Sequence, residues 1–258
     1  MRANSPGAFG RISVPLTGSV AQADPLSRIT FLRKVYALFG GAMAVWMGTS
    51  YLVATNEGLL NVAFGIMSFG IMGFIVLMAA MFFLLRLTAS RGNAMSMFGL
   101  GAFGVLEGFL TAPLIYIASA SQVASDALTS EQIHTLALND TGSIVTQAFA
   151  LTCAVFGGLS FYALTTKRDF SWMRGALWMG FFGLLAIGLL GMMGIGGGVS
   201  NWGYSMGFVI LMGGFVLYDT QNILRRYPEN MAASAAATLL IDFVIMFQHI
   251  LMLLMRRN

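Results

Sequence analysis

Residues 207–224 read GFVILMGGFVLYDTQNIL, an apolar stretch of membrane length that carries an acid, Asp219, near its end. A second acid, Asp242, lies early in the next apolar stretch, residues 239–247, which reads LLIDFVIMF. The connection between them is short, so two helices that cross a membrane here run antiparallel. At a rise of about 1.5 Å per residue, both acids are expected about 8–9 Å below the same membrane face. The sequence therefore predicts two carboxylates at equal depth on neighbouring helices.

The composition of the whole chain is typical of a membrane protein with several crossing helices. Of its 258 residues, 57% are hydrophobic and only 9% are charged, and the mean hydropathy is +0.79. A soluble core cannot use that much apolar surface. The net charge of +4 is small and is confined to tails and loops, which indicates membrane topology rather than nucleic-acid binding.

The reactive residues argue against an enzyme and against a resident cofactor. Cys153 is the single cysteine of the chain, and the chain has two histidines. An intramolecular disulfide, a Cys-x-x-Cys site and a His-rich metal site are therefore excluded. There is no Walker motif, HExxH or GxSxG. An intramembrane aspartyl protease would place Gly-x-Gly before its aspartate, and neither Asp219 nor Asp242 has that context.

The chain divides into a polar tail, residues 1–30, expected to be flexible and cytoplasmic, and a transmembrane domain, residues 31–258. Seven apolar runs follow the tail, each long enough to cross a bilayer as a helix. They are residues 35–54, 59–85, 95–119, 144–165, 173–195, 203–223 and 237–255. The fold class predicted is all-α.

Basic residues assign the tail and alternate connections to one side of the membrane. They are Arg2, Arg11, Arg28, Arg33, Lys34, Arg86, Arg91, Lys167, Arg168, Arg174, Arg225 and Arg226. Because cytoplasmic loops carry an excess of Lys and Arg, the N-terminus is predicted to be cytoplasmic. Arg256 and Arg257 disagree with this pattern if the last run crosses fully. Either its neighbours hold that helix in place, or it does not cross completely.

Two intramembrane aspartates are costly, so they mark an ion path, a proton relay or a partner. If Asp219 and Asp242 face each other, both cannot ionise freely, and the pair can share one proton as a pH-dependent latch near neutrality. Deprotonated, the two carboxylates form a hard oxygen site suited to Ca²⁺. The alternative for Asp219 is an acid at a helix end that pairs with Arg225 or Arg226.

Three further residues are candidates for the same interior. Arg86 ends the second run and is either a latch partner of the aspartates or an interfacial anchor. Glu107 lies mid-span and either lines the pore or hydrogen-bonds a neighbouring helix as the neutral acid. His249 lies seven residues after Asp242, on the same helical face, and either lines the pore or makes a structural hydrogen bond.

Residues 214–223, GFVLYDTQNI, resemble the signature of the Bax inhibitor-1 family, also called the transmembrane BAX inhibitor motif family. Residues 240–247, LIDFVIMF, resemble the last-helix motif of that family. The resemblance extends over about residues 30–255 and points to a bacterial member. It implies six transmembrane helices around a central C-terminal seventh, and a pH-sensitive Ca²⁺ leak sensed by Asp219 and Asp242. It also implies a latch role for Arg86.

The acid pair and the family resemblance together suggest two alternative functions. The first is a calcium leak channel of the bacterial inner membrane, gated by the aspartate pair, with Ca²⁺ and protons as its ligands. The second is a regulator that conducts nothing and binds another membrane protein, such as a membrane-anchored AAA protease, because bacterial relatives in the family modulate such a protease.

Overall fold

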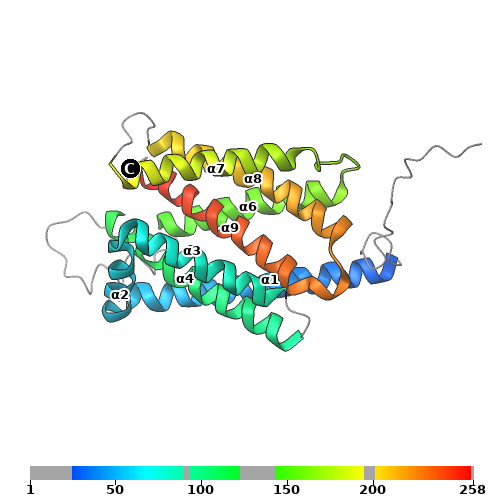
Figure 1. Ribbon diagram of the computed structural model, residues 1–258, viewed down its shortest axis with the longest axis horizontal. Helices are drawn as coiled ribbons and strands as arrows, with labels where there is room; N and C mark the ends of the chain where they lie inside the picture. Colours follow the sequence, from blue (N-terminus) through cyan, green and yellow to red (C-terminus); the bar gives the residue numbers. More distant parts are fainter. Residues whose placement is uncertain (1–24, 90–92, 123–142, 195–200, 257–258) are drawn as a thin grey trace, which may run out of the picture.

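In a computed structural model, the residues that the structure describes, 25–89, 93–122, 143–194 and 201–256, are mostly helical (Figure 1). The helices are α1 (Pro25–Thr55), α2 (Glu57–Ser68), α3 (Gly70–Thr88), α4 (Asn93–Gln122), α6 (Ile144–Thr165), α7 (Met173–Met192), α8 (Asn201–Arg226) and α9 (Ala232–Met255), with a 3-10 turn, η2 (Glu229–Met231), before α9. Among them, seven helices are long and apolar enough to cross a membrane. The prediction of an all-α membrane fold with seven crossing helices is confirmed.

The start of α1 differs from the expected domain boundary. The sequence places the tail at residues 1–30, whereas the helix begins at Pro25. Residues 1–24 lie outside the described residues, so the rest of the predicted tail stays a prediction.

The second crossing is shorter than its apolar run. The sequence predicts one helix over residues 59–85, but the run is divided at Gly70, whose φ is +56°. Residues with a side chain rarely adopt that backbone conformation, whereas glycine does so at no steric cost. A bilayer needs about 20 apolar residues, and α2 has only 12. The excess of the run therefore folds into a separate short helix, and α3 alone spans.

Helix α9 lies inside the bundle. It packs against α1, α3, α4, α6 and α8, and Figure 1 shows it crossing obliquely between α7 and α8 on one side and α3 and α4 on the other. In an apolar 18-residue stretch of the last crossing helix, 56% of the residues are buried, against 6% in the corresponding stretch of α7 and 0% in that of α3. Helix α7 packs against α8 and, less extensively, against α3. A complete ring of six helices around α9 stays a prediction.

The aromatic ring of Phe243 fixes the rotation of α9. Phe243 is 1% exposed and lies edge-on to rings from α1 and α6, with centroid distances of 5.4 to 6.1 Å. These rings are Phe39, Trp46, Phe149 and Phe156. Edge-to-face pairs of this kind add to the stabilisation that burial provides. Asp242, the preceding residue, is thereby directed to another side of the helix.

Helices α1 and α4 approach closely at Gly108. A Cβ at this position would lie 2.6 Å from the carbonyl oxygen of Trp46, and the Ser50 hydroxyl donates to the Gly108 carbonyl at 3.1 Å. The crossing therefore depends on a residue without a side chain, as is common between membrane helices.

The two ends of the bundle differ in which connections they carry. The start of α1, the α6–α7 connection and the α8–α9 turn lie at one end, and α9 ends at the other (Figure 1). With 24 residues, α9 is about 36 Å long at 1.5 Å per residue, which is enough to cross a bilayer completely. Arg256 lies at the far end, and Arg257 lies outside the described residues.

Candidate functional site

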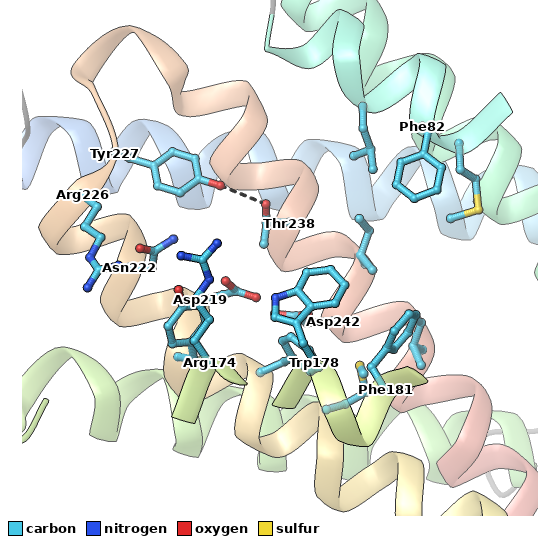
Figure 2. A pocket seen from close by; sticks show the side chains of 17 residues that line it. Phe82, Arg174, Trp178, Phe181, Asp219, Asn222, Arg226, Tyr227, Thr238 and Asp242 are labelled. Atoms are coloured by element: carbon cyan, nitrogen blue, oxygen red, sulfur yellow. Dashed lines mark hydrogen bonds between the residues drawn. The ribbon is translucent and has the colours of Figure 1, made fainter. Parts of the chain in front are cut away.

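A cavity of about 620 Å³ lies between α3, α7, α8 and α9, next to the α8–α9 turn. Most of its wall is apolar and comes from side chains such as Phe82, Trp178 and Phe215. Polar groups enter it from α7, α8, α9 and the turn (Figure 2). A volume of this size and a mostly apolar wall with a few polar groups are typical of ligand sites.

The structure brings Asp219 and Asp242 together in the wall of this cavity. Figure 2 shows the two carboxyl groups on neighbouring turns of α8 and α9. Asp219 is half-buried, whereas Asp242 is 4% exposed. Within the described residues, the Oδ2 atom of Asp242 is buried without a hydrogen-bond partner. A buried acceptor without a partner is costly, so this atom calls for a proton, water or a cation from the cavity.

The separations of the two acids from the ends of their helices differ from those that the sequence predicts, whereas their equal depth in the membrane stays a prediction. Asp219 lies seven residues before Arg226, where α8 ends, and Asp242 lies ten residues after Ala232, where α9 begins. These separations correspond to about 10 and 15 Å along the helix axes. The difference arises because α9 begins at Ala232, earlier than the apolar run at residue 237.

The arginine that the sequence assigns to the latch lies outside the cavity. Arg86 is exposed in the last turn of α3 and is not among the residues that line the cavity, although Leu85 is. The cations in the wall are Arg174, in the first turn of α7, and Arg226. A latch role for Arg86 stays a prediction. From the sequence, Arg174 is used only to orient the chain in the membrane. Its position inside the apolar run 173–195 is nevertheless a signal that it lies on a helix rather than in a loop.

The alternative pairing of Asp219 with an arginine at the end of α8 is wrong for this structure. Arg225 instead forms an ion pair with Asp169, with 3.4 Å between Nη1 and Oδ1. Arg226 donates a hydrogen bond from Nη2 to the Ser171 hydroxyl at 2.9 Å. In the described part of the chain, neither arginine forms an ion pair with Asp219.

These arginines are part of a contact that ties the α6–α7 connection to the end of α8. The side chain of Gln221 accepts a hydrogen bond from the Phe170 amide at 2.8 Å and donates one to the Arg168 carbonyl. Gln221 is 3% exposed; its bond with the Phe170 amide is buried, and its bond with the Arg168 carbonyl is partly buried. The contact holds the first turn of α7, and with it Arg174, beside the cavity.

Tyr227 forms part of the wall where the chain turns from α8 to α9. Its hydroxyl shares a hydrogen bond of 3.2 Å with the Thr238 hydroxyl across the turn (Figure 2). Burial raises the pKa of Tyr227, and the charges of Asp219 and Asp242 act in the same direction, against the lowering effect of Thr238. The tyrosine therefore stays a neutral hydrogen-bonding group at physiological pH.

The structure places Glu107 and His249 away from this cavity. Glu107 is 5% exposed on α4, and its carbonyl accepts a hydrogen bond from the Thr111 hydroxyl at 2.7 Å. The His249 Nδ1 lies 2.9 Å from the Ile245 carbonyl, and the ring stacks on Phe208 with a centroid distance of 4.2 Å. Neither residue lines the cavity. Their predicted role in lining a pore stays a prediction.

The two aspartates by themselves do not make a complete metal site. The described residues hold no group of three or more His, Cys, Asp or Glu side chains that could bind a metal. Ca²⁺ takes six to eight oxygen ligands, many of them water in weak sites. Two carboxylates with an unpartnered oxygen therefore fit a hydrated ion in passage better than a tightly held structural ion.

Comparison with known proteins assigns the chain to a family. Residues 28–258 match the family model described as "Inhibitor of apoptosis-promoting Bax1". The chain belongs to the Bax inhibitor-1 family. Both motif segments and six of the seven crossing helices fall within the matched residues, and the first crossing helix, Leu26–Thr55, begins two residues before them. The resemblance seen in the sequence is therefore confirmed. The chain is accordingly an integral membrane protein.

Individual members of the Bax inhibitor-1 family align over different lengths. An uncharacterised protein of Campylobacter jejuni is 40% identical over 131 residues, which cover 51% of this chain and 56% of that protein. Thus the match spans about half the length of that bacterial relative. A Golgi anti-apoptotic protein of vaccinia virus is 28% identical over 92% of this chain and 89% of its own. Protein lifeguard 4 of the mouse is 27% identical over 90% of this chain and 87% of that protein.

Proposed function

We propose that this protein is a pH-sensitive calcium leak channel of a bacterial inner membrane, with its N-terminus in the cytoplasm. The observation that carries the proposal is the meeting of Asp219 and Asp242 in one cavity, with the Oδ2 atom of Asp242 buried and unpartnered. Charged groups inside a membrane domain most often mark ion or proton pathways. The Ca²⁺ ion is the cargo here, and the protein needs no resident cofactor.

The chemistry of the pair links protons to calcium. With both carboxylates charged, their oxygens attract a divalent cation that water can help to coordinate. With a proton shared between them, the pair carries one charge fewer, and its attraction for Ca²⁺ falls accordingly. Flux through the cavity is therefore highest when both acids are ionised and falls as the pH is lowered.

Reconstitution into liposomes that contain a calcium dye tests this proposal. The change in flux with pH is measured for the wild type, Asp219→Asn and Asp242→Asn. We expect each substitution to reduce the flux and to flatten its pH dependence. Glu57→Gln is the matched control, because Glu57 is an exposed acid at the start of α2, outside the cavity. If both cavity variants keep the flux and pH profile of the wild type, the proposal fails.

A second candidate function is a non-conducting regulator that binds another membrane protein, such as a membrane-anchored protease. The full-length similarity to a viral protein named for its anti-apoptotic action favours this alternative, since the name describes regulation rather than transport. Helices α3 and α7 expose large apolar side chains, including Phe83 and Met179, to the lipid bilayer or to such a partner. Crosslinking in native membranes distinguishes the two. A partner retained by both Asn variants, together with no flux in liposomes, would favour the regulator.

A further inference from the structure

The proton of the Tyr227 hydroxyl is already engaged at the α8–α9 turn. The Thr238 hydroxyl donates a hydrogen bond of 3.1 Å to the Ser234 carbonyl, one turn earlier on α9. A hydroxyl has one proton and two acceptor lone pairs, so Thr238 accepts in the 3.2 Å hydrogen bond that it shares with Tyr227. Tyr227 is therefore the donor of that bond, and its oxygen has only lone pairs left to offer to the cavity.

Tyr227 lies close enough to both acids for their charges to act on it. All three side chains line the cavity, and burial together with the charges of Asp219 and Asp242 raises the pKa of Tyr227. Figure 2 shows the bond between Tyr227 and Thr238 beside the two carboxyl groups. The lone pairs of Tyr227 and the unpartnered Oδ2 atom of Asp242 thus belong to one group of polar atoms in the cavity wall.

The charged and titratable groups of the cavity wall come from α7, α8, α9 and the turn. They are Arg174 from α7, Tyr218, Asp219 and Arg226 from α8, Tyr227 from the turn and Asp242 from α9. Helix α3 contributes only apolar side chains to the lining, and Arg226 donates to Ser171. The Ser234 side chain also lies near the Tyr227 hydroxyl. The two acids therefore share the wall with cations from α7 and α8, and with a neutral hydroxyl from the turn whose proton is engaged.

We infer that the Tyr227 hydroxyl oxygen accepts a hydrogen bond from the protonated acid pair and so sets the pH at which the leak closes. The inference rests on the proposed function, because it takes the two aspartates as the pH sensor of the leak. A carboxyl group donates to an acceptor only while it carries its proton, so an acceptor stabilises the protonated pair and not the carboxylates. Thr238 acts through Tyr227, because it holds the proton that the tyrosine would otherwise donate to a carboxylate.

The pH dependence of Ca²⁺ flux in dye-loaded liposomes tests this inference on the full-length protein. Tyr227→Phe removes the acceptor, so we expect the midpoint of the pH dependence to fall by about 0.5–1 pH unit, the effect of one hydrogen bond. Thr238→Val frees the Tyr227 proton for donation to a carboxylate, which stabilises the charged pair, so the midpoint should fall further. The double variant should match Tyr227→Phe, because Thr238 acts only through the tyrosine hydroxyl.

Two matched variants control for the loss of a hydroxyl. Tyr51→Phe makes the same change at an exposed tyrosine of α1 that does not line the cavity. Thr238→Ser keeps the hydroxyl that accepts from Tyr227. Both variants should keep the midpoint of the wild type.

The outcomes separate this inference from the proposed function. A midpoint in Tyr227→Phe at or above that of the wild type, with the pH dependence still flattened by Asp219→Asn, would overturn the role of Tyr227 and leave the acid pair standing. Additive shifts in the double variant would also overturn it, because Thr238 would then act by another route. If Tyr227→Phe does not fold, equal midpoints in Thr238→Val and Thr238→Ser contradict the inference. No flux in the wild type would overturn the proposed function and this inference together.

Discussion

The turn of α9 that packs Phe243 among four aromatic rings also directs Asp242 into the cavity. The two side chains are consecutive and point to different sides of the helix, one toward α1 and α6 and the other toward α8. The orientation of the buried acid therefore depends on an apolar contact that lies outside the site.

Replacing Phe243 with alanine should destabilise the protein and disturb the site together. Removing a buried ring of this size costs about 3–5 kcal/mol, and we expect a lower unfolding temperature in detergent and a weaker flux. Phe161→Ala is the control, because that ring is 68% exposed and should cost much less. Equal losses of stability in the two variants would contradict the anchoring role of Phe243.

Gly108→Ala should weaken the contact between α1 and α4. The added Cβ would lie 2.6 Å from the Trp46 carbonyl oxygen, and relieving such an overlap costs about 1–3 kcal/mol. Gly101→Ala, on the same helix, has no neighbouring atom within 4 Å and should be neutral or slightly stabilising, because alanine favours helices. Thermal unfolding of both variants in the same detergent checks this pair. A variant of Gly108 as stable as that of Gly101 would contradict the close crossing.

Gln221→Ala should release the α6–α7 connection. The Phe170 amide loses its partner, while the Arg168 carbonyl keeps the hydrogen bond from Arg225 Nη2 at 3.3 Å. A buried group left without a partner costs about 1–3 kcal/mol. We expect faster hydrogen exchange over residues 166–172. Asn222→Ala is the adjacent control, because Asn222 lines the cavity without holding the connection. Unchanged exchange in Gln221→Ala would show that the arginines hold the connection unaided.

The ion pair at the same connection should make a small, acid-sensitive contribution to stability. Hydrogen bonds from the Ser171 hydroxyl and amide lower the pKa of Asp169 below its usual 3.8, and the charges of Arg225 and Arg226 act in the same direction. Since the folded-state pKa is lower than the unfolded one, the stabilisation is fully present above about pH 4 and is lost as the pH falls through the folded value.

Comparing Asp169→Asn with the wild type checks this sign. The variant should unfold at a slightly lower temperature near neutral pH, and the difference should disappear in acid. The difference is small because Asp169 is exposed and screened by solvent. A difference that grows as the pH is lowered would contradict this argument.

Periodicity and composition are sufficient to predict the crossing helices, and the spacing of Asp219 and Asp242 is sufficient to predict that the two acids meet. The division of the second run at Gly70 could not be predicted, because glycine is common within membrane helices and only the backbone shows that this one has a positive φ. Which arginines line the cavity beside the two acids is harder still to predict from the sequence. Arg86 and Arg174 lie on the same side by charge pattern, and only the packing of α7 against α8 decides that Arg174 enters the cavity.

The bonds of Gln221 and the pairing of Arg225 join the beginning of α7 to the end of α8. These two helices consequently behave as one stiff arm at this end of the bundle. Helix α3 has no such fastening in the described residues and borders the same cavity with apolar side chains. Widening of the cavity is therefore expected along the side that faces α3, where it would break no hydrogen bond among the described residues.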